Sequence, residues 1–191
     1  MTLMEKTGHT WSVSIQYDPV IYYARNRVLC GNNVSGATQA PFNGMNYDYT
    51  IWIDDDIVWN STHILQLIES GKDIIGGCYL THDNKHYPIV EHLDYNALAT
   101  NGTFQFMDRA ALSLKDDLFE VNYTGFGFTA VKKGVFEAIQ YPWFRPRWVQ
   151  YNNFTDFTSE DVGFCWDAIE RGYKIWIDPS IIVGHQKTFI I

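Results

Sequence analysis

Apolar residues along the chain follow two different spacings, and each spacing predicts a different element. Continuous apolar runs at residues 48–53 and 73–80 are typical of strands that are buried on both faces. Apolar residues at helical spacing predict helices at residues 20–30, 60–70 and 159–173. Strands that alternate with helices in this way predict an α/β fold.

The first residues predict one further strand. Residues 10–16 alternate between polar and apolar side chains, which would place Trp11, Val13 and Ile15 on one face of a strand. A short helical piece, Thr2 to Lys6, is predicted ahead of it and would stop at Gly8. We therefore expect the chain to enter its sheet early.

The rest of the chain completes the predicted sheet. Residues 81–117 lack a clear period, and a hairpin around Asn101-Gly102 is the best interpretation of this insert. Residues 118–139 predict two extended pieces and a helix, and residues 174–187 predict a strand, a turn and a tail. Together these elements predict a mostly parallel sheet with helices on both faces, in one domain that spans residues 1–191.

Three consecutive aspartates, Asp54, Asp55 and Asp56, follow the apolar run that ends at Ile53. If the strand continued, Asp54 and Asp56 would project together and Asp55 would point away. Two carboxylates held that close repel each other unless a cation, backbone N–H groups or a proton intervenes. A solvated acidic turn is the simpler alternative. Ligands of α/β sheets bind at the carboxyl ends of strands, where these aspartates stand.

A second acidic pair begins the predicted helix at residues 159–173. Ser159 is a candidate N-cap, which places Glu160 and Asp161 in the first turn. Acids are favoured there by the helix dipole alone, so the position has a structural explanation. A carboxylate at that end could also face a cleft and accept a proton from a hydroxyl group, as a general base does.

His185 and Lys187 lie near the end of the chain, on the same side of an extended tail. A neutral imidazole can join carboxylates around a divalent cation such as Mn²⁺, and a lysine can neutralise phosphate oxygens. An isolated histidine is more often structural. These two residues indicate a metal or phosphate site only in combination with the aspartates.

Composition and charge limit the function classes. The net charge of −8 argues against a dedicated nucleic-acid-binding protein, which normally has a basic face. No apolar run is long enough to span a membrane, and the first residues lack a signal-peptide core. Three widely spaced cysteines indicate reduced, buried thiols and a cytoplasmic location. The many aromatic side chains could form core or stack on sugar rings.

The order of these motifs resembles the GT-A fold of nucleotide-sugar glycosyltransferases. A buried strand that ends in D-x-D is followed by the Gly-Gly strand, by "GFGF", by "SED" at a helix start, and by "RGYKIWIDPS" before a final "GH". The set is similar to the small single-domain forms encoded by large viruses and phages. It covers residues 24–187, almost the whole chain.

The resemblance implies a role for each acidic residue. Asp56 would bind a divalent metal directly, Mn²⁺ or Mg²⁺, and Asp54 would reach the metal through water or contact the ribose. His185 would complete the metal shell, and Asp55 would touch the donor sugar. The remaining roles fall to the helix pair. Asp161 would be the catalytic base if the reaction inverts the configuration, while a retaining reaction stays open as the alternative. Glu160 would help to hold the acceptor or the donor sugar.

Further positions follow from the same resemblance. Arg25 and Asn26 would lie near the nucleotide, and Lys187 would stabilise the departing diphosphate. Gly125 and Gly127 would let the backbone approach the sugar. Three aromatic residues are candidate acceptor platforms, with a core position as the equal alternative: Phe126, Trp143 and Trp148.

The implied activity is transfer of a hexosyl or deoxyhexosyl group from a nucleoside-diphosphate sugar, with a UDP-sugar expected, to a glycan hydroxyl. The chain could also be part of a larger multidomain protein, because GT-A chains usually begin with a strand and loop that are not recognisable here. Two other functions stay open. They are a nucleotidyltransferase that acts on sugar phosphates and a non-catalytic carbohydrate-binding module. A haloacid-dehalogenase-type phosphohydrolase would need Gly-Thr after the aspartates, where Ile57 and Val58 stand.

Overall fold

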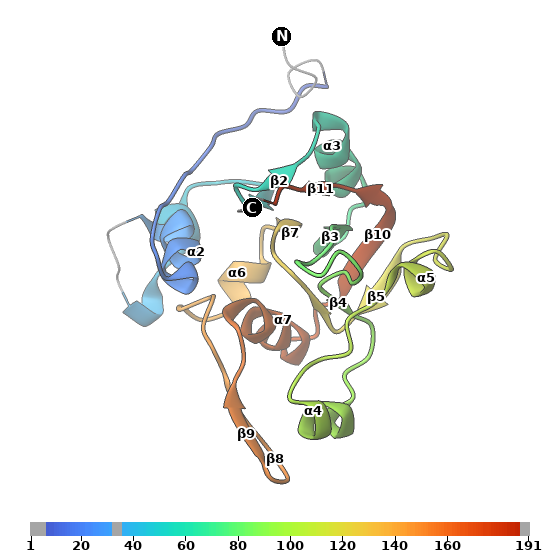
Figure 1. The fold of residues 1–191 in the computed structure, drawn as a ribbon. Helices are drawn as coiled ribbons and strands as arrows, with labels where there is room; N and C mark the ends of the chain where they lie inside the picture. Colours follow the sequence, from blue (N-terminus) through green and yellow to red (C-terminus); the bar gives the residue numbers. More distant parts are fainter. Residues whose placement is uncertain (1–6, 32–35, 188–191) are drawn as a thin grey trace.

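A computed structural model describes residues 7–31 and 36–187 of the chain (Figure 1). Its main feature is a five-stranded sheet in the order β1-β7-β3-β10-β5. The strands of this sheet are β1 (Tyr49–Ile53), β7 (Phe128–Lys132), β3 (Ile74–Cys78), β10 (Ile175–Ile182) and β5 (Phe119–Val121). The longer helices are α2 (Ile21–Cys30), α3 (Ser61–Glu69) and α7 (Glu160–Glu170). The predicted α/β class is therefore confirmed.

The prediction of a mostly parallel sheet is wrong. Only β3 and β10 pair in parallel, while β1 with β7, β7 with β3, and β10 with β5 are antiparallel. Because β7 runs antiparallel to both of its neighbours, β1 and β3 point in the same direction although they do not touch. The strands β1, β3 and β10 therefore all end at one edge of the sheet. Periodicity along a strand carries no information about the direction of its neighbour, so the sequence could not show this.

Apolar side chains cover both faces of the sheet, as continuous apolar strands predict. On one face, Ile74, Val131 and Ile175 pack in a cluster that also contains α7 residues. On the other face, Ile75 and Ala130 pack in a cluster with residues of α3. Successive residues of one strand enter different clusters, so the sheet is sandwiched between helical layers.

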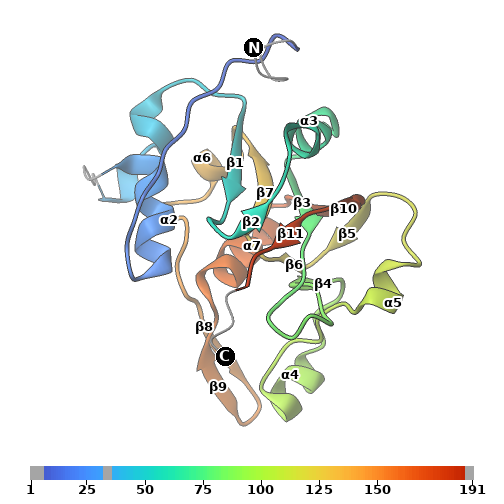
Figure 2. The same cartoon turned by 45° about the horizontal axis from the view of Figure 1, so that its top comes forward.

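Short paired strands surround the main sheet. β2 (Ile57–Val58) pairs with β11 (Gly184–His185), β4 (Ile89–Val90) pairs with β6 (Tyr123–Thr124), and β8 (Trp148–Tyr151) pairs with β9 (Phe154–Phe157). Figure 2 shows β2 and β11 side by side near the ends of the sheet strands. The hairpin β8–β9 and helix α4 (Tyr95–Asn101) extend from the same side of the molecule, where Tyr151 Oη donates to Asn96 Oδ1 over 3.2 Å.

The predicted hairpin around Asn101-Gly102 is not formed. Asn101 ends α4, and Gly102 caps that helix in the left-handed conformation, with φ of 66°. Glycine is favoured at such a C-cap as well as in a hairpin turn, so the residue pair fits both interpretations. Asp94 caps the other end through its side chain, which accepts from two backbone N–H groups. The insert also contains the short helix α5 (Arg109–Leu112). Within residues 7–31 and 36–187, the remaining short helices are η1 (Gly36–Thr38), η2 (Pro41–Gly44) and α6 (Val135–Ala138).

The predicted amino-terminal strand is also wrong. Residues 9–18 are extended but join no strand among the described residues, and Trp11, Val13 and Ile15 are 56%, 68% and 82% exposed. The side chain of Ser14 holds this segment to α2 by donating to the Val28 carbonyl over 3.3 Å. The expected helix at Thr2 to Lys6 lies outside the described residues.

Candidate functional site

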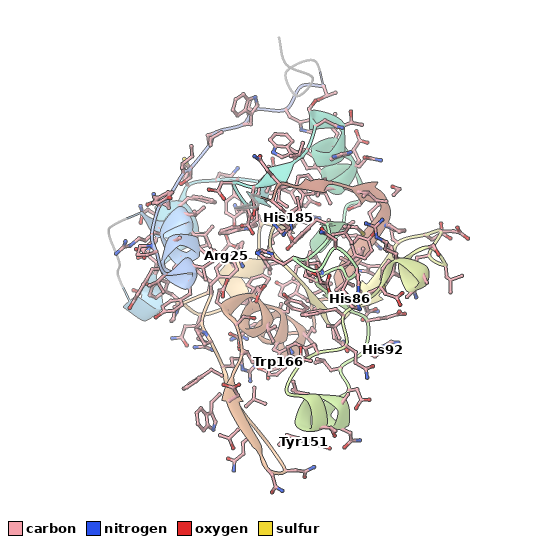
Figure 3. All side chains as sticks on the ribbon, in the orientation of Figure 1. Arg25, His86, His92, Tyr151, Trp166 and His185 are labelled. Carbon is pink, nitrogen blue, oxygen red and sulfur yellow. The ribbon has the colours of Figure 1, made fainter. Side chains whose placement is uncertain are left out.

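The predicted site residues gather at the edge where β1, β3 and β10 end. Asp54 follows β1, Tyr79 follows β3, and His185 lies three residues beyond the end of β10. Glu160 begins α7 at the same edge, where Arg25 of α2 reaches it. Figure 3 shows Arg25 and His185 in the same central region of the molecule. One common strand direction thus brings residues from distant parts of the chain together.

The three aspartates form a tight turn rather than a continuation of the strand. The Ile57 N–H donates to the Asp54 carbonyl over 3.1 Å, and the Asp54 N–H donates to the Gly127 carbonyl over 3.0 Å. Asp54 and Asp56 still face the same region, whereas Asp55 is exposed. The acidic turn and the paired carboxylates, which the sequence offered as alternatives, therefore occur together. The expected contact of Asp55 with a donor sugar stays a prediction.

Arg25 joins the two acidic pairs. Its guanidinium lies 3.5 Å from Asp54 Oδ1 and 2.9 Å from Glu160 Oε1, and its side chain is 8% exposed. The rings of Phe126 and Phe144 lie 5.4 Å and 5.8 Å from the guanidinium carbon. A buried arginine with two carboxylate partners and aromatic neighbours is held in one position.

The charges of this cluster change its pKa values. Burial raises the pKa of Asp54, against the opposing effect of Arg25, and Asp56 raises it further. Burial also raises the pKa of Glu160, with a further contribution from Asp161 and an opposing one from Arg25. Burial alone would lower the pKa of Arg25, but Asp54, Asp161 and Glu160 raise it above its ordinary value. The free site thus holds more carboxylate charge than one arginine neutralises.

His185 faces Asp56 because β11 pairs with β2. That register places His185 opposite Ile57, and the Gln186 N–H donates to the Asp56 carbonyl over 2.7 Å. His185 Nδ1 lies 2.6 Å from the Leu80 carbonyl oxygen, so Nδ1 carries the hydrogen in the neutral ring. The Nε2 lone pair then faces Asp56 Oδ2 at 2.9 Å. Two electron-rich atoms at that distance need a proton or a metal ion between them.

Lys187 supplies positive charge beside this pair. Its Nζ lies 2.9 Å from His185 Nδ1, 3.1 Å from His185 Nε2 and 2.9 Å from His82 Nδ1. Because Nδ1 already faces the Leu80 carbonyl, we interpret the ammonium as lying against the ring rather than bonding to that nitrogen. An ammonium on a flexible stem in this position can move to a phosphate oxygen.

Two of the three predicted metal ligands fit a divalent cation. Neighbouring ligands of an octahedral cation, each at about 2.1 Å, are separated by roughly 3 Å, close to the distance between His185 Nε2 and Asp56 Oδ2. The hydrogen bond from Nδ1 to a carbonyl is the second contact that metal-binding histidines usually make. Asp54 faces Arg25 instead. Within residues 7–31 and 36–187, no group of three or more His, Cys, Asp or Glu side chains is placed to hold a metal ion.

Asp161 is fixed by a tyrosine. Tyr123 Oη donates to Asp161 Oδ2 over 2.9 Å, and the Val162 N–H donates to Asp161 Oδ1 over 2.8 Å. Burial raises the pKa of Tyr123, and Asp161 raises it further, so the phenol keeps its proton and remains a donor. Ser159 precedes the helix as expected but makes no side-chain capping bond. The orientation of Asp161 therefore comes from Tyr123 and from the backbone.

Asn26 does not face the cluster as a free nucleotide contact. Its amide nitrogen donates to the carbonyls of Tyr22 and Phe144 over 2.7 Å each, and its oxygen accepts from the Phe144 N–H over 3.2 Å. These bonds tie α2 to the loop before β8. The buried polar side chain is thus explained by packing.

The two glycines of "GFGF" make room for a side chain of the protein. A Cβ at Gly127 would lie 2.7 Å from Tyr79 Cζ, and one at Gly125 would collide with the Tyr79 hydroxyl. We expected these glycines to leave space for a sugar, but the side chain of Tyr79 fills the space beside them. Two of the candidate platforms, Phe126 and Trp143, are core residues, whereas Trp148 is 60% exposed and faces Phe157 across the hairpin.

Sequence reasoning missed Tyr79 and Tyr123. The apolar run at residues 73–80 predicts that Tyr79 belongs to a buried strand, whereas it occupies the same place after β3 that Asp54 occupies after β1. That shared position was the available signal. Nothing along the chain pairs Tyr123 with Asp161, because 38 residues separate them.

Comparison with known proteins supports the fold alone. No family model matches the chain, and no curated protein matches it. Among solved structures, the crystal structure of A197 from STIV aligns with 98% of this chain and 86% of its own, with a TM-score of 0.53 and 15% sequence identity. In the described part of the chain, no helix is long and apolar enough to cross a bilayer.

Proposed function

We propose that the protein is a metal-dependent glycosyltransferase with a GT-A type of site, which moves a sugar from a nucleoside-diphosphate sugar to a glycan hydroxyl. The observation that carries the proposal is the convergence on Arg25. Asp54 of the D-x-D turn and Glu160 of the helix pair share this buried guanidinium, so the two acidic pairs belong to one site. A carbohydrate-binding module would not need two acidic pairs and a buried arginine together.

The first acidic pair is suited to hold the donor. Asp56 and His185 would hold Mn²⁺ or Mg²⁺, which would act as a Lewis acid on the diphosphate. Lys187, beside His185, would neutralise a phosphate oxygen that gains charge as the bond to the sugar breaks. Arg25 keeps Asp54 and Glu160 in place without leaving its buried position. The excess carboxylate charge in the free protein favours the binding of a cation to this site.

The second acidic pair is suited to handle the proton. Asp161 would take the proton of the acceptor hydroxyl as the acceptor oxygen bonds to the anomeric carbon. The bond from that carbon to the phosphate oxygen breaks, and the nucleoside diphosphate leaves with the electron pair. Tyr123 and the Val162 N–H hold the carboxylate of Asp161 in one orientation, which a general base requires. Attack from the side opposite the leaving group inverts the configuration.

A UDP-sugar donor and a cytoplasmic location are part of the proposal. The location is supported by Cys30, Cys78 and Cys165, which are buried and free. Burial raises the pKa of Cys78 to about 12, so this thiol is unreactive at neutral pH.

Calorimetry with UDP, GDP, ADP and CDP, with and without Mn²⁺, tests the donor site. We expect one nucleoside diphosphate to bind only when Mn²⁺ is present, and the corresponding nucleotide sugars to release that diphosphate when glycan acceptors are added. Binding of glycans alone, independent of metal, would instead indicate a binding module. Release of pyrophosphate from a nucleoside triphosphate and a sugar phosphate would indicate a nucleotidyltransferase.

A further inference from the structure

Several contacts fix the side chain of Tyr79 at the candidate site. Its hydroxyl accepts a hydrogen bond from the Gly127 N–H over 3.0 Å, and its ring meets the ring of His185 edge to face at 5.5 Å. Gly125 and Gly127 lack the Cβ atoms that would collide with this phenol. Three separate features, namely two glycines, a backbone donor and an imidazole, thus place one oxygen atom.

Backbone contacts relate the hydroxyl of Tyr79 to both acidic pairs. Gly127, which donates to this hydroxyl, also accepts a hydrogen bond from the Asp54 N–H over 3.0 Å. Gly125, which packs against the same hydroxyl, lies two residues after Tyr123, the donor to Asp161. Tyr79 is 8% exposed. Burial is the main cause that raises the pKa of Tyr79, with smaller contributions from Asp54 and Asp161. A phenol is a neutral donor at neutral pH even without such a shift.

The bonding of this hydroxyl is incomplete in the free protein. A phenol can accept and donate at the same time, and Gly127 uses only the accepting side. Among the described residues, no side chain or carbonyl accepts the Tyr79 proton in a hydrogen bond. A buried donor without an acceptor costs free energy, and a ligand oxygen that accepts the proton would recover it.

We propose that Tyr79 donates a hydrogen bond to a hydroxyl oxygen of the sugar that is transferred. This inference rests on the proposed function, which places the diphosphate at Asp54 and Asp56 and the acceptor at Asp161. The transferred sugar would then lie between these two ends, in reach of the residues that surround the Tyr79 hydroxyl. The contact belongs to the sugar rather than to the nucleotide or the metal.

The test compares a nucleotide sugar with its nucleoside diphosphate. The probe is whichever of UDP-glucose, UDP-galactose, UDP-N-acetylglucosamine and GDP-mannose binds wild type most tightly with Mn²⁺, together with UDP or GDP. In Tyr79→Phe we expect the affinity for the nucleotide sugar to fall about 5- to 10-fold, the effect of one lost hydrogen bond. The affinity for the diphosphate should stay within about two-fold of wild type. Tyr87→Phe, which removes a hydroxyl from a buried tyrosine outside the site, should leave both affinities unchanged.

A second measurement uses wild type, because Tyr79→Phe also deprives the Gly127 N–H of its acceptor. The amide resonance of Gly127 should shift when the nucleotide sugar is added to protein saturated with Mn²⁺, and should shift less with the diphosphate. Equal effects of Tyr79→Phe on both ligands, or equal amide shifts, would overturn the sugar contact and leave the proposed function standing. Failure of wild type to bind any of the probes would remove the proposed function, and this inference with it.

Discussion

The acidic pair after β1 and the acidic pair at the start of α7 are built in similar ways but are suited to different tasks. In each pair one residue contacts Arg25, Asp54 in the first and Glu160 in the second. The other residue faces a ring: Asp56 faces the imidazole of His185, and Asp161 faces the phenol of Tyr123. Both pairs therefore have one anchored and one chemically available carboxylate.

The partners and the exposure of the two pairs differ. The side chains of Asp54 and Asp56 are 42% and 43% exposed, whereas that of Glu160 is 9% exposed. An imidazole that turns a lone pair toward a carboxylate favours a cation between them, while a phenol only donates a hydrogen bond and leaves the carboxylate charged. The comparison indicates that the partner of a carboxylate, more than its position in the sequence, sets its chemistry. The expected effects of four substitutions test this division.

The largest effect is expected at Asp161. Asp161→Asn keeps the size of the side chain and an oxygen for Tyr123, but it removes the group that takes the proton. Positioned general bases contribute about 10² to 10⁴ in rate, so sugar transfer should fall by that factor. Mn²⁺-dependent diphosphate binding should be almost unchanged, and the free energy of unfolding should fall by no more than about 1 kcal/mol from the lost dipole interaction. Transfer assays and calorimetry on the same preparation measure both.

Asp156→Asn is the matched control, because Asp156 is an exposed acid on the hairpin. It should transfer sugar at the wild-type rate. Near-normal transfer by Asp161→Asn would make Asp161 a helix-terminal acid only, and the inverting reaction would be abandoned. Loss of diphosphate binding in Asp161→Asn would show that the second acidic pair also takes part in binding the donor.

Asp56→Ala should have the next largest effect, this time on binding. Loss of contacts around metal ligands costs about 10- to 100-fold in metal affinity, so loss of a direct ligand should weaken Mn²⁺-dependent diphosphate binding by about 100-fold or more. Asp55→Ala is the closest control, since Asp55 is the exposed neighbour in the same turn. Diphosphate binding should change little there. Equal titration curves for the two variants would refute the metal assignment.

His185→Ala should weaken the same binding less, by about 10-fold, because an imidazole brings no negative charge to a cation. The expected order of affinities for the diphosphate with Mn²⁺ is wild type, then His185→Ala, then Asp56→Ala. His92→Ala changes a largely exposed histidine and should match wild type. A variant at position 185 that binds like wild type would show that this histidine is structural.

Glu160→Gln should have the smallest effect, on stability. Burial raises the pKa of Glu160 above its ordinary value of 4.5, so folding favours the protonated form. The stabilisation from Glu160 is then present at low pH and lost as the pH rises through the pKa of the folded state. Glutamine resembles the protonated form at every pH. Melting temperatures should therefore be similar near pH 4, and the variant should be the more stable protein at pH 7. A variant that melts below wild type at pH 7 would show that the ion pair with Arg25 outweighs burial.

Much of the site could be predicted from the sequence, because the residues concerned stand where elements begin or end. Asp54, Asp56 and Glu160 are adjacent to a strand or helix whose apolar pattern is clear, and β1, α3 and α7 lie within a few residues of their predicted ranges. Side chains that are brought in by the fold were harder to find. The bonds of Asn26 to Phe144 and of Tyr123 to Asp161 join residues 118 and 38 positions apart. Local sequence patterns cannot predict contacts between residues that are so far apart in the chain.

Strand pairing shows the same limit. The segments at 10–16 and 48–53 both have strand-like patterns, yet only the second pairs with a neighbour among the described residues. A pattern states which face of a strand could be buried, while a strand also requires a neighbour with free backbone groups. For the same reason the direction of β7 could not be predicted, although its residues could.

β1 is an edge strand of the five-stranded sheet, which has a practical consequence for handling the protein. Asp48 and Asp54 exchange backbone hydrogen bonds with β7 and its flanking residues, so the N–H and C=O groups of Tyr49, Ile51 and Ile53 point to the open side of the sheet. Trp11, Val13 and Ile15 are exposed in a neutral extended segment that could pair with such an edge on another molecule. We therefore expect concentrated solutions of the protein to self-associate through these backbones. A lysine in place of Val13 would improve solubility without contact with any residue of the site.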